Sequence, residues 1–472
     1  MIDINNLTIR KAHNDLKEGK YTVVQLVEAY LENIKDKNPK LNAYLEVFDD
    51  VLEESKKAQE KFSNGTATFL TGIPMAVKDN ILIKGKVASA SSKILENHVA
   101  TYDATVIELL KKEGVIFLGR TNMDEFAMGS STENSAFGPT LNPIDPTRVP
   151  GGSSGGSASA LGADMALSAL GTETCGSVRE PAAFCGLVGL KPTYGAFSRE
   201  GIIAMGNSLD QVSPFGKNID DVEIIFNTLS KYDKFDNTSI PENQRTSEIK
   251  DKNLKKIGVP FHLFENGVDA EIKENFNQSL EKFKNLGYEI VDISLPFSKY
   301  SLAAYYIIMP AEVSTNLSRF DGIRYGHRED GQNVTDVYKK TKSVGFGPET
   351  RRRIILGTYV LSHGYYDAYY NKAWKIRHAM SEEINKAFQD VAFIMTPTVP
   401  VLPFKIGEKT KDPVSMYLCD IFSAPANLVG LPSLAIPSGK NKDNLPFSIQ
   451  ITAPHFCEEN LFKIGKEFEN LN

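Results

Sequence analysis

Serine and lysine residues in three separate segments have the types that amide hydrolysis uses. The stretch VPGGSSGGSASA at 149–160 places Ser153 among glycines, and the turn GTETCGS places Ser177 where a helix is expected to begin. Lys78 lies in the apolar stretch 69–80, near the expected end of a strand, so its ammonium group is expected to be drawn into the protein. A serine attacks an amide only when a base takes its proton. The three segments therefore define a candidate active site.

Each of these residues also has an ordinary structural interpretation. A lysine at a strand end is usually solvated, and a serine at a helix start usually caps the helix. The seven histidines are scattered, and none stands beside a G-x-S-x-G turn. A histidine triad stays open at this point, because triad members lie far apart in sequence. Taken singly, each residue fits its structural role better; only the three segments taken together favour a catalytic site.

The glycine-serine stretch 149–160 is expected to be a folded loop and not a linker. Linkers have polar, low-complexity flanks, whereas NPIDPTRVP precedes this stretch and the alanine-rich ASALGADMALSALG follows it. The stretch has neither a GxxxxGK[ST] motif nor a GxGxxG motif with an acid about 20 residues later, so it matches neither nucleotide-binding pattern. We expect it to open a helix and to present backbone N–H groups and hydroxyls.

Short apolar runs alternate with helical patterns along the chain. Strands are expected at 69–80, 114–121, 165–173, 255–261, 289–295, 391–397, 432–438 and 447–453, and helices lie between most of them, for example at 104–114 and 273–287. This alternation predicts an α/β fold whose sheet is covered on both faces by helices. The tyrosines of 357–374 recur at helical spacing, which favours a half-buried packing helix over a base-stacking surface.

Composition limits the class of protein. The 472 residues are 41% hydrophobic and 24% charged, as in ordinary globular chains, and the formal net charge of −6 gives no basic field for nucleic acid. Any RNA is therefore expected to be held by another subunit. Four cysteines form neither a disulfide framework nor a zinc pattern, which is typical of a reducing cytosol. We expect no signal peptide, no membrane span and a cytoplasmic location.

In this order, the three segments resemble the amidase signature family, which has a Ser–cis-Ser–Lys triad. Lys78 and Ser153 are 75 residues apart, and Ser153 and Ser177 are 24 apart, which is that family's spacing. Within the family, the resemblance is to the A subunits of the glutamyl-tRNA(Gln)/aspartyl-tRNA(Asn) amidotransferases and covers nearly the whole chain. It is carried by KDNI (79–82), SSKIL (91–95), YDATV (102–106), TNMDEFAMGSSTENS (121–135), GLKPTYG (189–195), NLSRFDGIRYG (316–326), LGTYVLS (356–362) and GYYDAYY (364–370).

The resemblance implies the roles of the catalytic residues. Ser177 is the expected nucleophile, Ser153 the proton relay on a cis peptide bond, and Lys78 the neutral base, whose pKa must fall by about 2–3 units from about 10.4. Ser154 is expected instead to support the helix that follows. The backbone N–H groups of the turn are the expected oxyanion hole, from Thr174, Cys175, Gly176 and Ser177.

The resemblance also implies a pocket for glutamine. Asp420 is expected to bind the α-amino group, and Arg353 to hold the α-carboxylate through a bidentate fork. Tyr305 is expected to line the pocket, although the sequence does not separate it from Tyr306. The structural alternative for Arg353 is a surface position within the basic run 351–353. No metal site is expected.

A single amidase signature domain over 1–472, with a large mixed sheet, also follows from the resemblance. We expect N-terminal helices at 1–60, a catalytic core at 61–230 and a polar surface excursion at 231–254. The C-terminal part at 255–472 is expected to complete the sheet and the substrate pocket.

Departures from the family gather in the catalytic turn. The amidotransferase subunits usually read GSDTGGSIRQPA, whereas this chain reads GTETCGSVREPA. Cys175 replaces a glycine, which would cost about 1 kcal/mol or more if this position needed a positive φ. Glu173 lengthens an acid, and Glu180 adds one. Ala196 and Cys419 stand where arginine and asparagine are usual. These changes leave the triad intact, but they raise the alternative of a divergent paralogue that acts on a different small amide.

Three hypotheses follow. The leading one is a glutamine amidohydrolase subunit that feeds ammonia to B and C partner subunits in a heterotrimer. It would need no cofactor itself, ATP and Mg²⁺ would act in the partner, and tRNA would be contacted only indirectly. The alternative is a free-standing amidase for a small carboxamide or an N-acyl amino acid, using the same mechanism. The third, a non-catalytic scaffold, is disfavoured by the intact spacing of Lys78, Ser153 and Ser177.

Overall fold

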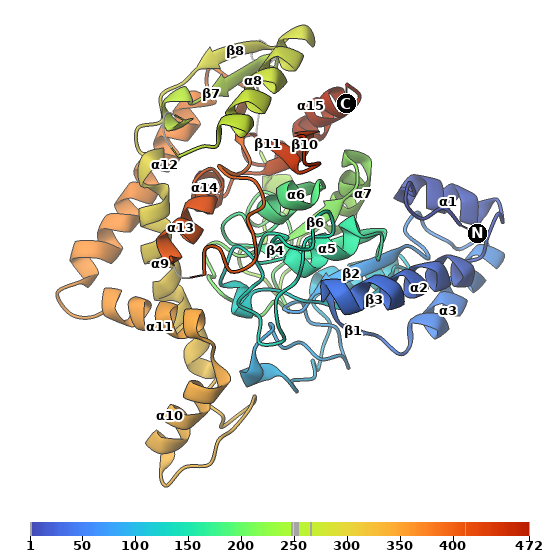
Figure 1. Ribbon diagram of the computed structural model, residues 1–472, viewed down its shortest axis with the longest axis horizontal. Helices are drawn as coiled ribbons and strands as arrows, with labels where there is room; N and C mark the ends of the chain where they lie inside the picture. The colour runs from blue at the N-terminus through green and yellow to red at the C-terminus, as the bar shows by residue number, and fades with distance from the viewer. Residues whose placement is uncertain (1, 247–248, 250–253, 265–266, 411, 472) are drawn as a thin grey trace.

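A long mixed β-sheet runs through the molecule. The computed structural model describes residues 2–246, 249, 254–264, 267–410 and 412–471. Within these residues the sheet has eleven strands in the order β1-β3-β2-β4-β6-β5-β10-β11-β9-β7-β8 (Figure 1). The strands are β1 (Tyr44–Val47), β2 (Pro74–Lys78), β3 (Ile116–Thr121), β4 (Ser168–Glu173), β5 (Val188–Lys191), β6 (Gln211–Gly216), β7 (Lys256–Val259), β8 (Glu289–Asp292), β9 (Phe393–Pro397), β10 (Ser433–Lys440) and β11 (Pro446–Thr452). The predicted fold class, α/β with a large mixed sheet, is confirmed.

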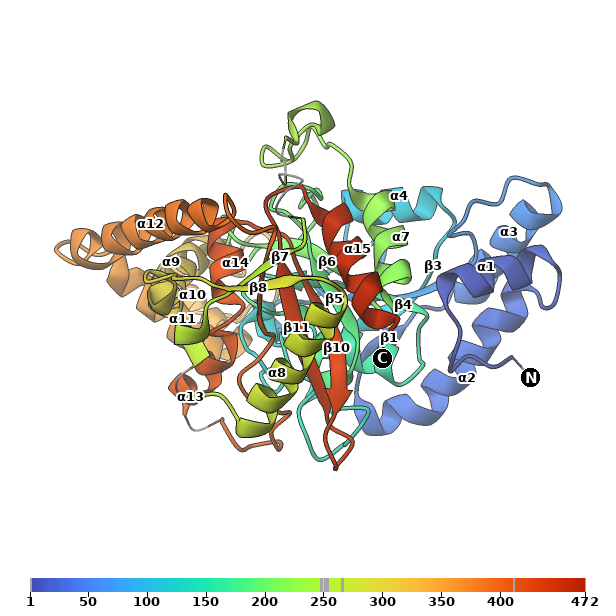
Figure 2. The same cartoon turned by 90° about the horizontal axis from the view of Figure 1, so that it is seen from above.

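Helices pack around this sheet. They are α1 (Ile9–Lys17), α2 (Val23–Leu41), α3 (Val51–Ser63), α4 (Thr105–Lys112), α5 (Gly155–Gly162), α6 (Arg179–Cys185), α7 (Ile219–Leu229), α8 (Ala270–Asn285), α9 (Ser301–Asn316), α10 (Val334–Gly345), α11 (Pro348–Val360), α12 (Asn371–Ala387), α13 (Pro413–Tyr417), α14 (Ala424–Val429) and α15 (Glu458–Glu469). Figures 1 and 2 place α1–α3 at one end of the molecule and α9–α12 at the other. None of the described helices combines the length and apolar character that a membrane crossing needs.

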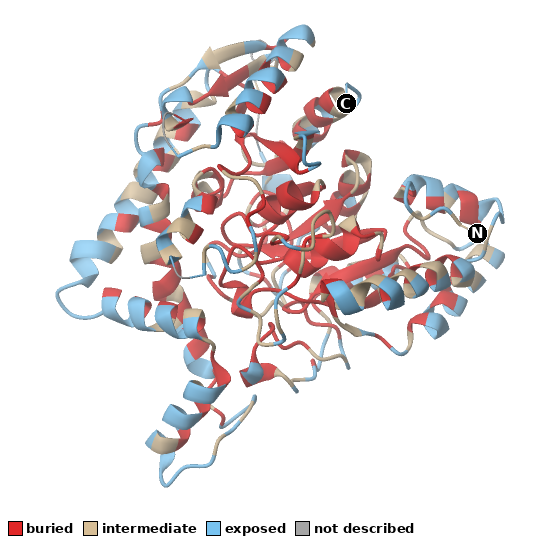
Figure 3. Ribbon diagram, in the orientation of Figure 1, coloured by how far each residue is buried: buried red, intermediate tan, exposed pale blue. Residues whose placement is uncertain are grey.

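The centre of the sheet forms the core. Every residue of β2, β4, β5 and β6 is buried, and Figure 3 shows this buried region beneath α5 and α6. Strands buried on both faces read as continuous runs and not as alternating patterns. The edge strands β1 and β8 are instead partly exposed. Residues at the ends of the central strands are therefore held in a rigid, water-poor environment.

The tyrosine-rich segment 357–374 differs from its prediction. Helix α11 ends at Val360, a π-helical turn follows at Tyr366–Tyr370, and α12 then begins. Tyr359 near the end of α11, Tyr365 just before the turn, and Tyr366 and Tyr369 on it are exposed. The prediction of a half-buried packing helix is wrong for these rings, because the break after Val360 ends the helical spacing on which it depended.

The polar stretch 231–254 lies partly outside the described residues. In its described part, Asp233 accepts hydrogen bonds from the hydroxyls of Thr105 and Ser198, both at 2.6 Å. Asp236 accepts one from the backbone N–H of Arg199 at 2.8 Å. This part of the stretch is therefore fixed to the body of the protein by its acidic side chains.

Candidate functional site

Lys78 lies at the end of β2 in the middle of the sheet and is completely buried. Its Nζ atom contacts three oxygens: the hydroxyls of Ser153 and Ser154, both at 2.8 Å, and the carbonyl of Thr172 at 3.1 Å. Burial lowers the pKa of Lys78 from its ordinary value to about 7, although the charges of Asp124, Asp210 and Glu173 oppose the shift. A large fraction of Lys78 is therefore neutral near pH 7, as a lysine base requires.

The proton count around Lys78 distinguishes the two serines. A neutral amine keeps two hydrogens and one lone pair, so the nitrogen must accept at one of its three contacts. The carbonyl of Thr172 has no proton to give, and the hydroxyl of Ser154 donates to that carbonyl at 3.1 Å. Only the hydroxyl of Ser153 is left to donate to Nζ. The arrangement therefore fits Ser153, and not Ser154, as the proton-relaying group.

The loop that carries these serines is held by backbone hydrogen bonds. The peptide bond between Gly152 and Ser153 is cis. The N–H of Asp124 donates to the carbonyl of Ser153, and the N–H of Ser154 donates to the carbonyl of Ser177, both at 3.2 Å. A Cβ atom on Gly152 would lie 2.2 Å from an Asp124 carboxyl oxygen. Glycine is therefore required there by the lack of space.

Ser154 stands at the start of α5, as expected of a residue that supports this helix. Its side chain, however, makes no capping hydrogen bond to the helix. It links Lys78 to the carbonyl of Thr172 instead. Ser154 thus fixes the lysine against β4, and the sequence pattern of a helix-capping serine does not reveal this contact.

The turn from Thr174 to Ser177 follows β4 directly. Gly176 has a φ of +83°, whereas Cys175 does not adopt a positive φ. The cysteine therefore brings none of the backbone strain considered above, and burial raises the pKa of its thiol well above the usual range. Within the described part of the chain, the backbone N–H groups of Cys175, Gly176 and Ser177 donate to no other residue. They are available to an oxyanion.

A buried ion pair spans the same turn. Glu173 accepts hydrogen bonds from the backbone N–H groups of Val178 and Arg179 and from the Arg179 guanidinium, which makes two bonds to Glu173, the shorter at 2.6 Å. Both side chains are fully buried. Burial acts to raise the pKa of Glu173, but Arg179 outweighs it and holds that pKa below its usual value. Arg179 also reaches Gln450 at 2.6 Å. The longer acid at position 173 therefore closes the turn around Ser177.

Replacing Arg179 by methionine is expected to lower the free energy of unfolding by about 3–5 kcal/mol, because Glu173 then stays buried without its partner. Urea titration of the full chain measures this change. Arg10→Met is a matched control, since its partner Asp220 is 31% exposed and Arg10 itself is 56% exposed. That control is expected to cost at most about 1 kcal/mol. Equal losses for the two variants would contradict the role given to the buried pair.

Asp420 lies against the catalytic turn and is buried. One of its oxygens accepts hydrogen bonds from the hydroxyls of Tyr306 at 3.0 Å and Ser130 at 3.4 Å. Its other oxygen, Oδ1, has no described partner and would lie 3.0 Å from a Cβ atom placed on Gly176. Burial raises the pKa of Asp420 to about 7. One unpartnered carboxyl oxygen of Asp420 therefore stands next to the expected oxyanion hole.

Arg353 is buried, whereas Arg351 and Arg352 are exposed, so the surface interpretation of Arg353 is wrong. Its Nε atom donates to Glu349 at 2.8 Å, and its guanidinium lies 5.4 Å from the ring centre of Tyr306. Tyr306 therefore contacts both expected binding residues, Asp420 through its hydroxyl and Arg353 through its ring. An acid and a base that contact the same tyrosine are a suitable pair for binding a zwitterion.

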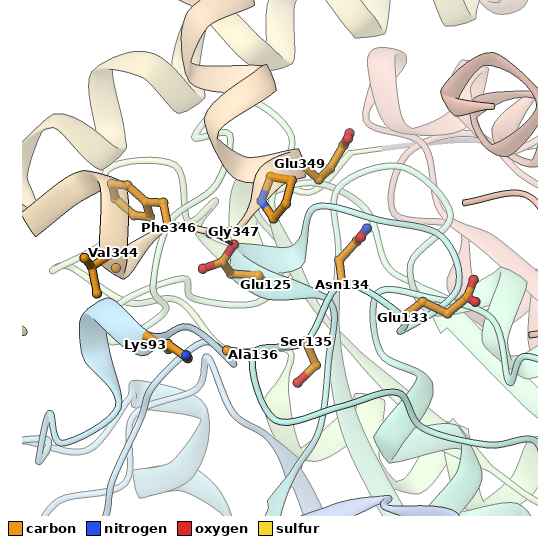
Figure 4. Close-up of a pocket in the computed structure, with 12 residues that line it drawn as sticks. Lys93, Glu125, Glu133, Asn134, Ser135, Ala136, Val344, Phe346, Gly347 and Glu349 are labelled. Carbon is orange, nitrogen blue, oxygen red and sulfur yellow. Dashed lines mark hydrogen bonds between the residues drawn. The ribbon is translucent and has the colours of Figure 1, made fainter. Parts of the chain in front are cut away.

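A cavity of about 400 Å³ has Glu349, the ion-pair partner of Arg353, in its wall. Figure 4 shows it between the segment around Glu133 and Asn134 and the segment that leads to Glu349. Glu125 lies on its wall and accepts hydrogen bonds from the backbone N–H of Gly347 at 2.8 Å and the hydroxyl of Thr350 at 2.6 Å. Glu349 thus belongs both to the cavity wall and to the Arg353 ion pair.

The structure brings most of the expected site residues together. Lys78 and Ser153 touch, the loop of Ser153 is bonded to Ser177, and Asp420 borders Gly176. Tyr305 is buried with its ring edge-on to Tyr306 at 4.9 Å. Sequence reasoning missed four contacting residues, namely Ser130, Tyr306 as the partner of Asp420, Glu349 and Tyr417. Of these four, only Glu349 could have been found from the sequence, because it lies four residues before Arg353 on a helix and such residues are neighbours.

Comparisons with known proteins agree with this geometry. The family model described as Amidase matches residues 25–462. The A subunit of the glutamyl-tRNA(Gln) amidotransferase of Thermoanaerobacter pseudethanolicus is 48% identical to this chain, covering 100% of it and 97% of the relative. The second of the corresponding A subunits of Clostridium acetobutylicum is 46% identical, with 99% of each chain covered. A crystal structure of the Thermotoga maritima A subunit superposes with a TM-score of 0.81 at 40% identity, covering 100% of this chain and 96% of that one. The chain therefore belongs to the amidase family, as an amidase-type hydrolase.

Proposed function

We propose that this chain is the glutamine amidohydrolase subunit of a tRNA-dependent amidotransferase, working in the cytoplasm. It releases ammonia from glutamine, and partner subunits use the ammonia to amidate Glu-tRNA(Gln) or Asp-tRNA(Asn). The observation that carries the proposal is the joint placement of Lys78 and Ser153 at the turn of Ser177, with Asp420 beside that turn. The amidotransferase A subunits that match the whole chain support it.

The chemistry follows from the contacts. Ser177 Oγ attacks the side-chain carbonyl carbon of glutamine, while its proton moves to Ser153 and the proton of Ser153 moves to Lys78 Nζ. The oxyanion forms at the N–H groups of the turn, each worth about 3 kcal/mol. The C–N bond then breaks, and a proton returns to the leaving nitrogen, which departs as ammonia. Water hydrolyses the Ser177 ester to glutamate and restores the serine.

The charged residues around Tyr306 hold the other end of glutamine. Asp420 accepts from the α-ammonium group, and Arg353 donates to the α-carboxylate. Tyr306 keeps the two apart, since its hydroxyl is bonded to Asp420 at 3.0 Å and its ring faces Arg353. The carboxamide is thereby placed at Ser177. Tyr305 supports the ring of Tyr306 from its edge.

The proposed partners are two further chains, a B and a small C subunit, which complete a heterotrimer. ATP and Mg²⁺ act in the partner subunit, where tRNA is bound, and this chain needs no cofactor of its own. The formal net charge of −6 agrees with the assignment of tRNA binding to another subunit. The alternative, a free-standing amidase, requires no such partner.

Co-expression with candidate B and C chains tests the proposal. We expect a stable complex that releases ammonia from glutamine faster than the lone chain does, with further acceleration by ATP and charged tRNA. A lone chain that hydrolyses some other amide rapidly, and neither binds the partners nor acts on glutamine, would overturn the proposal in favour of the free-standing amidase.

The pH dependence of the complex gives a second check. Only neutral Lys78 takes a proton, and burial sets its pKa at about 7. Below that pH, kcat for glutamine is expected to fall about tenfold per unit, and above it to level off. Asp420, with a pKa of about 7, must be ionised to hold an ammonium, so KM is expected to rise in the same acidic range. Steady-state kinetics from pH 5 to pH 9 separate the two effects. A kcat that is flat down to about pH 5 would contradict the role of Lys78.

A further inference from the structure

Tyr417 is a half-buried tyrosine that the mechanism above does not use. Its hydroxyl donates to Oε1 of Glu349 at 2.8 Å. The same oxygen accepts the hydrogen bond from Nε of Arg353, also at 2.8 Å. Burial acts to raise the pKa of Glu349, but Arg353 outweighs it and holds that pKa below its usual value. Tyr417 is therefore bonded to the ionised carboxylate that holds Arg353.

The contact with Glu349 determines which edge of Arg353 is free. Nε is occupied by Oε1 of Glu349, and Nη1 lies 3.7 Å from the sulfur of Met309, which is a weak acceptor. Among the described residues, no oxygen accepts a hydrogen bond from Nη1 or Nη2. The edge formed by these two nitrogens is thus left for a bidentate carboxylate, and its direction depends on Glu349.

Tyr417 also belongs to the segment that carries Asp420. It is the last residue of α13, and a 3₁₀ turn at Leu418–Asp420 follows directly. Its ring stacks on the ring of Tyr306, with the ring centres 3.9 Å apart and the planes 22° apart. The hydroxyl of Tyr306 in turn donates to Asp420 at 3.0 Å. Tyr417 is therefore connected to the proposed ammonium ligand both along the chain and through a stacked ring.

The two stacked rings connect the two ends of the proposed substrate pocket. The guanidinium carbon of Arg353 lies 5.4 Å from the ring centre of Tyr306 and 5.4 Å from that of Tyr417. One ring carries the hydroxyl bonded to Asp420, and the other carries the hydroxyl bonded to Glu349. Hydrogen bonds are directional, whereas ring pairs stack over a range of offsets. The bond from Tyr417 to Glu349 is therefore the more exact link between the two ends.

We propose that Tyr417 is a positioning residue that, through Glu349, fixes the spacing between the groups that bind the carboxylate and the ammonium of the substrate. It thereby selects amides whose carboxylate and amino group stand on the same carbon. This inference rests on the proposed function, which assigns the two charged groups but not what sets their spacing. Binding groups must be held within about 0.5 Å of the productive geometry by the side chains that support them.

Loss of the Tyr417 hydroxyl is expected to weaken binding and to leave the chemistry intact. Tyr417→Phe keeps the ring that stacks on Tyr306, but the segment of Asp420 and α11 then adopt several relative positions. Loss of one hydrogen bond to a charged group leaves about one tenth of the molecules with the spacing that glutamine needs, so KM rises about tenfold. Bound glutamine restores the spacing, and kcat is expected to stay within about twofold.

The test compares glutamine with 3-amino-4-carbamoylbutanoate, an isomer whose amino group is one carbon further from the carboxylate. The isomer is measured in the complex by its Ki against glutamine, which equals its KM if it is also hydrolysed. In Tyr417→Phe we expect this Ki to stay within about twofold, because the isomer does not use the fixed spacing. The ratio of Ki for the isomer to KM for glutamine is therefore expected to fall about tenfold.

Tyr288→Phe is the matched control, since the hydroxyl of Tyr288 also donates to a glutamate carboxyl, that of Glu467 at 3.0 Å, outside the site. Its ratio is expected to equal that of the wild type. An unchanged ratio in Tyr417→Phe, with glutamine still hydrolysed, would overturn this inference alone, and so would a loss of kcat at constant KM. A wild-type complex that releases no ammonia from glutamine would instead overturn the proposed function.

A double-mutant cycle tests the path from Tyr417 through Glu349. Glu349→Gln removes the charge that accepts from both Tyr417 and Arg353, and we expect it to raise KM for glutamine at least as much as Tyr417→Phe does. Adding Tyr417→Phe to Glu349→Gln is expected to raise KM by less than about threefold further, because the two residues share one contact. Effects that multiply in full would contradict this path.

Discussion

Ser177→Ala is expected to lower kcat for ammonia release from glutamine by about 10⁴-fold or more. The turn that follows β4 leaves the N–H groups of Cys175, Gly176 and Ser177 for the oxyanion, and these remain in the variant. The loss therefore reports the missing nucleophile and not a damaged oxyanion hole. KM for glutamine is expected to change little, since Asp420 and Arg353 hold the substrate at its other end.

The acyl-enzyme gives a direct readout of this prediction. Quenching the wild-type reaction and measuring the intact mass is expected to show a glutamyl adduct on the chain, and Ser177→Ala is expected to show none. Ser168→Ala serves as the matched control, because Ser168 is also buried on β4 but donates to the carbonyl of Phe215 at 3.0 Å. That variant is expected to keep full activity per folded molecule. An adduct that survives in Ser177→Ala would place the nucleophile elsewhere.

Much of the sheet follows from the sequence, because its strands are continuous apolar runs. All eight predicted strand segments contain a strand. The missed strands are β1, β5 and β6, for physical reasons. β1 is a four-residue edge strand with partial exposure, and β6 contains Pro214 and ends at Gly216, which are residues that normally mark turns. Pairing with buried neighbours on both sides overrides these local signals in β6.

The site is only partly visible in the sequence. The spacing of Lys78, Ser153 and Ser177, with the resemblance it carries, is enough to expect their meeting. The hydrogen bond from Tyr306 to Asp420 joins residues 114 positions apart, and no periodicity selects Tyr306 over its neighbour Tyr305. Such contacts depend on how α9 packs against the segment before α14. The sequence therefore predicts reacting groups better than it predicts the groups that orient the substrate.

Burial alone does not identify the base. Lys191 on β5 is as fully buried as Lys78, and burial lowers the pKa of each to about 7. Lys191, however, donates to the carbonyl of Pro192 at 2.9 Å and touches no serine of the turn or of the glycine-rich loop. The two lysines thus have similarly lowered pKa values and differ in their contacts. What makes Lys78 a candidate base is the proton that Ser153 alone can offer it.

This pair of lysines provides the sharpest test of the mechanism. Lys78→Met is expected to lower kcat by about 10³-fold or more, because Ser153 then has no acceptor for its proton, while KM stays close to the wild-type value. Lys191→Met removes an equally buried amine and is expected to keep kcat per folded molecule. Active-site titration with a glutamine analogue that acylates Ser177 in the wild type corrects both rates for unfolded protein. Equal losses of kcat in the two variants would show that burial of a lysine supports only the fold, and the proton would then have to leave Ser153 by another route.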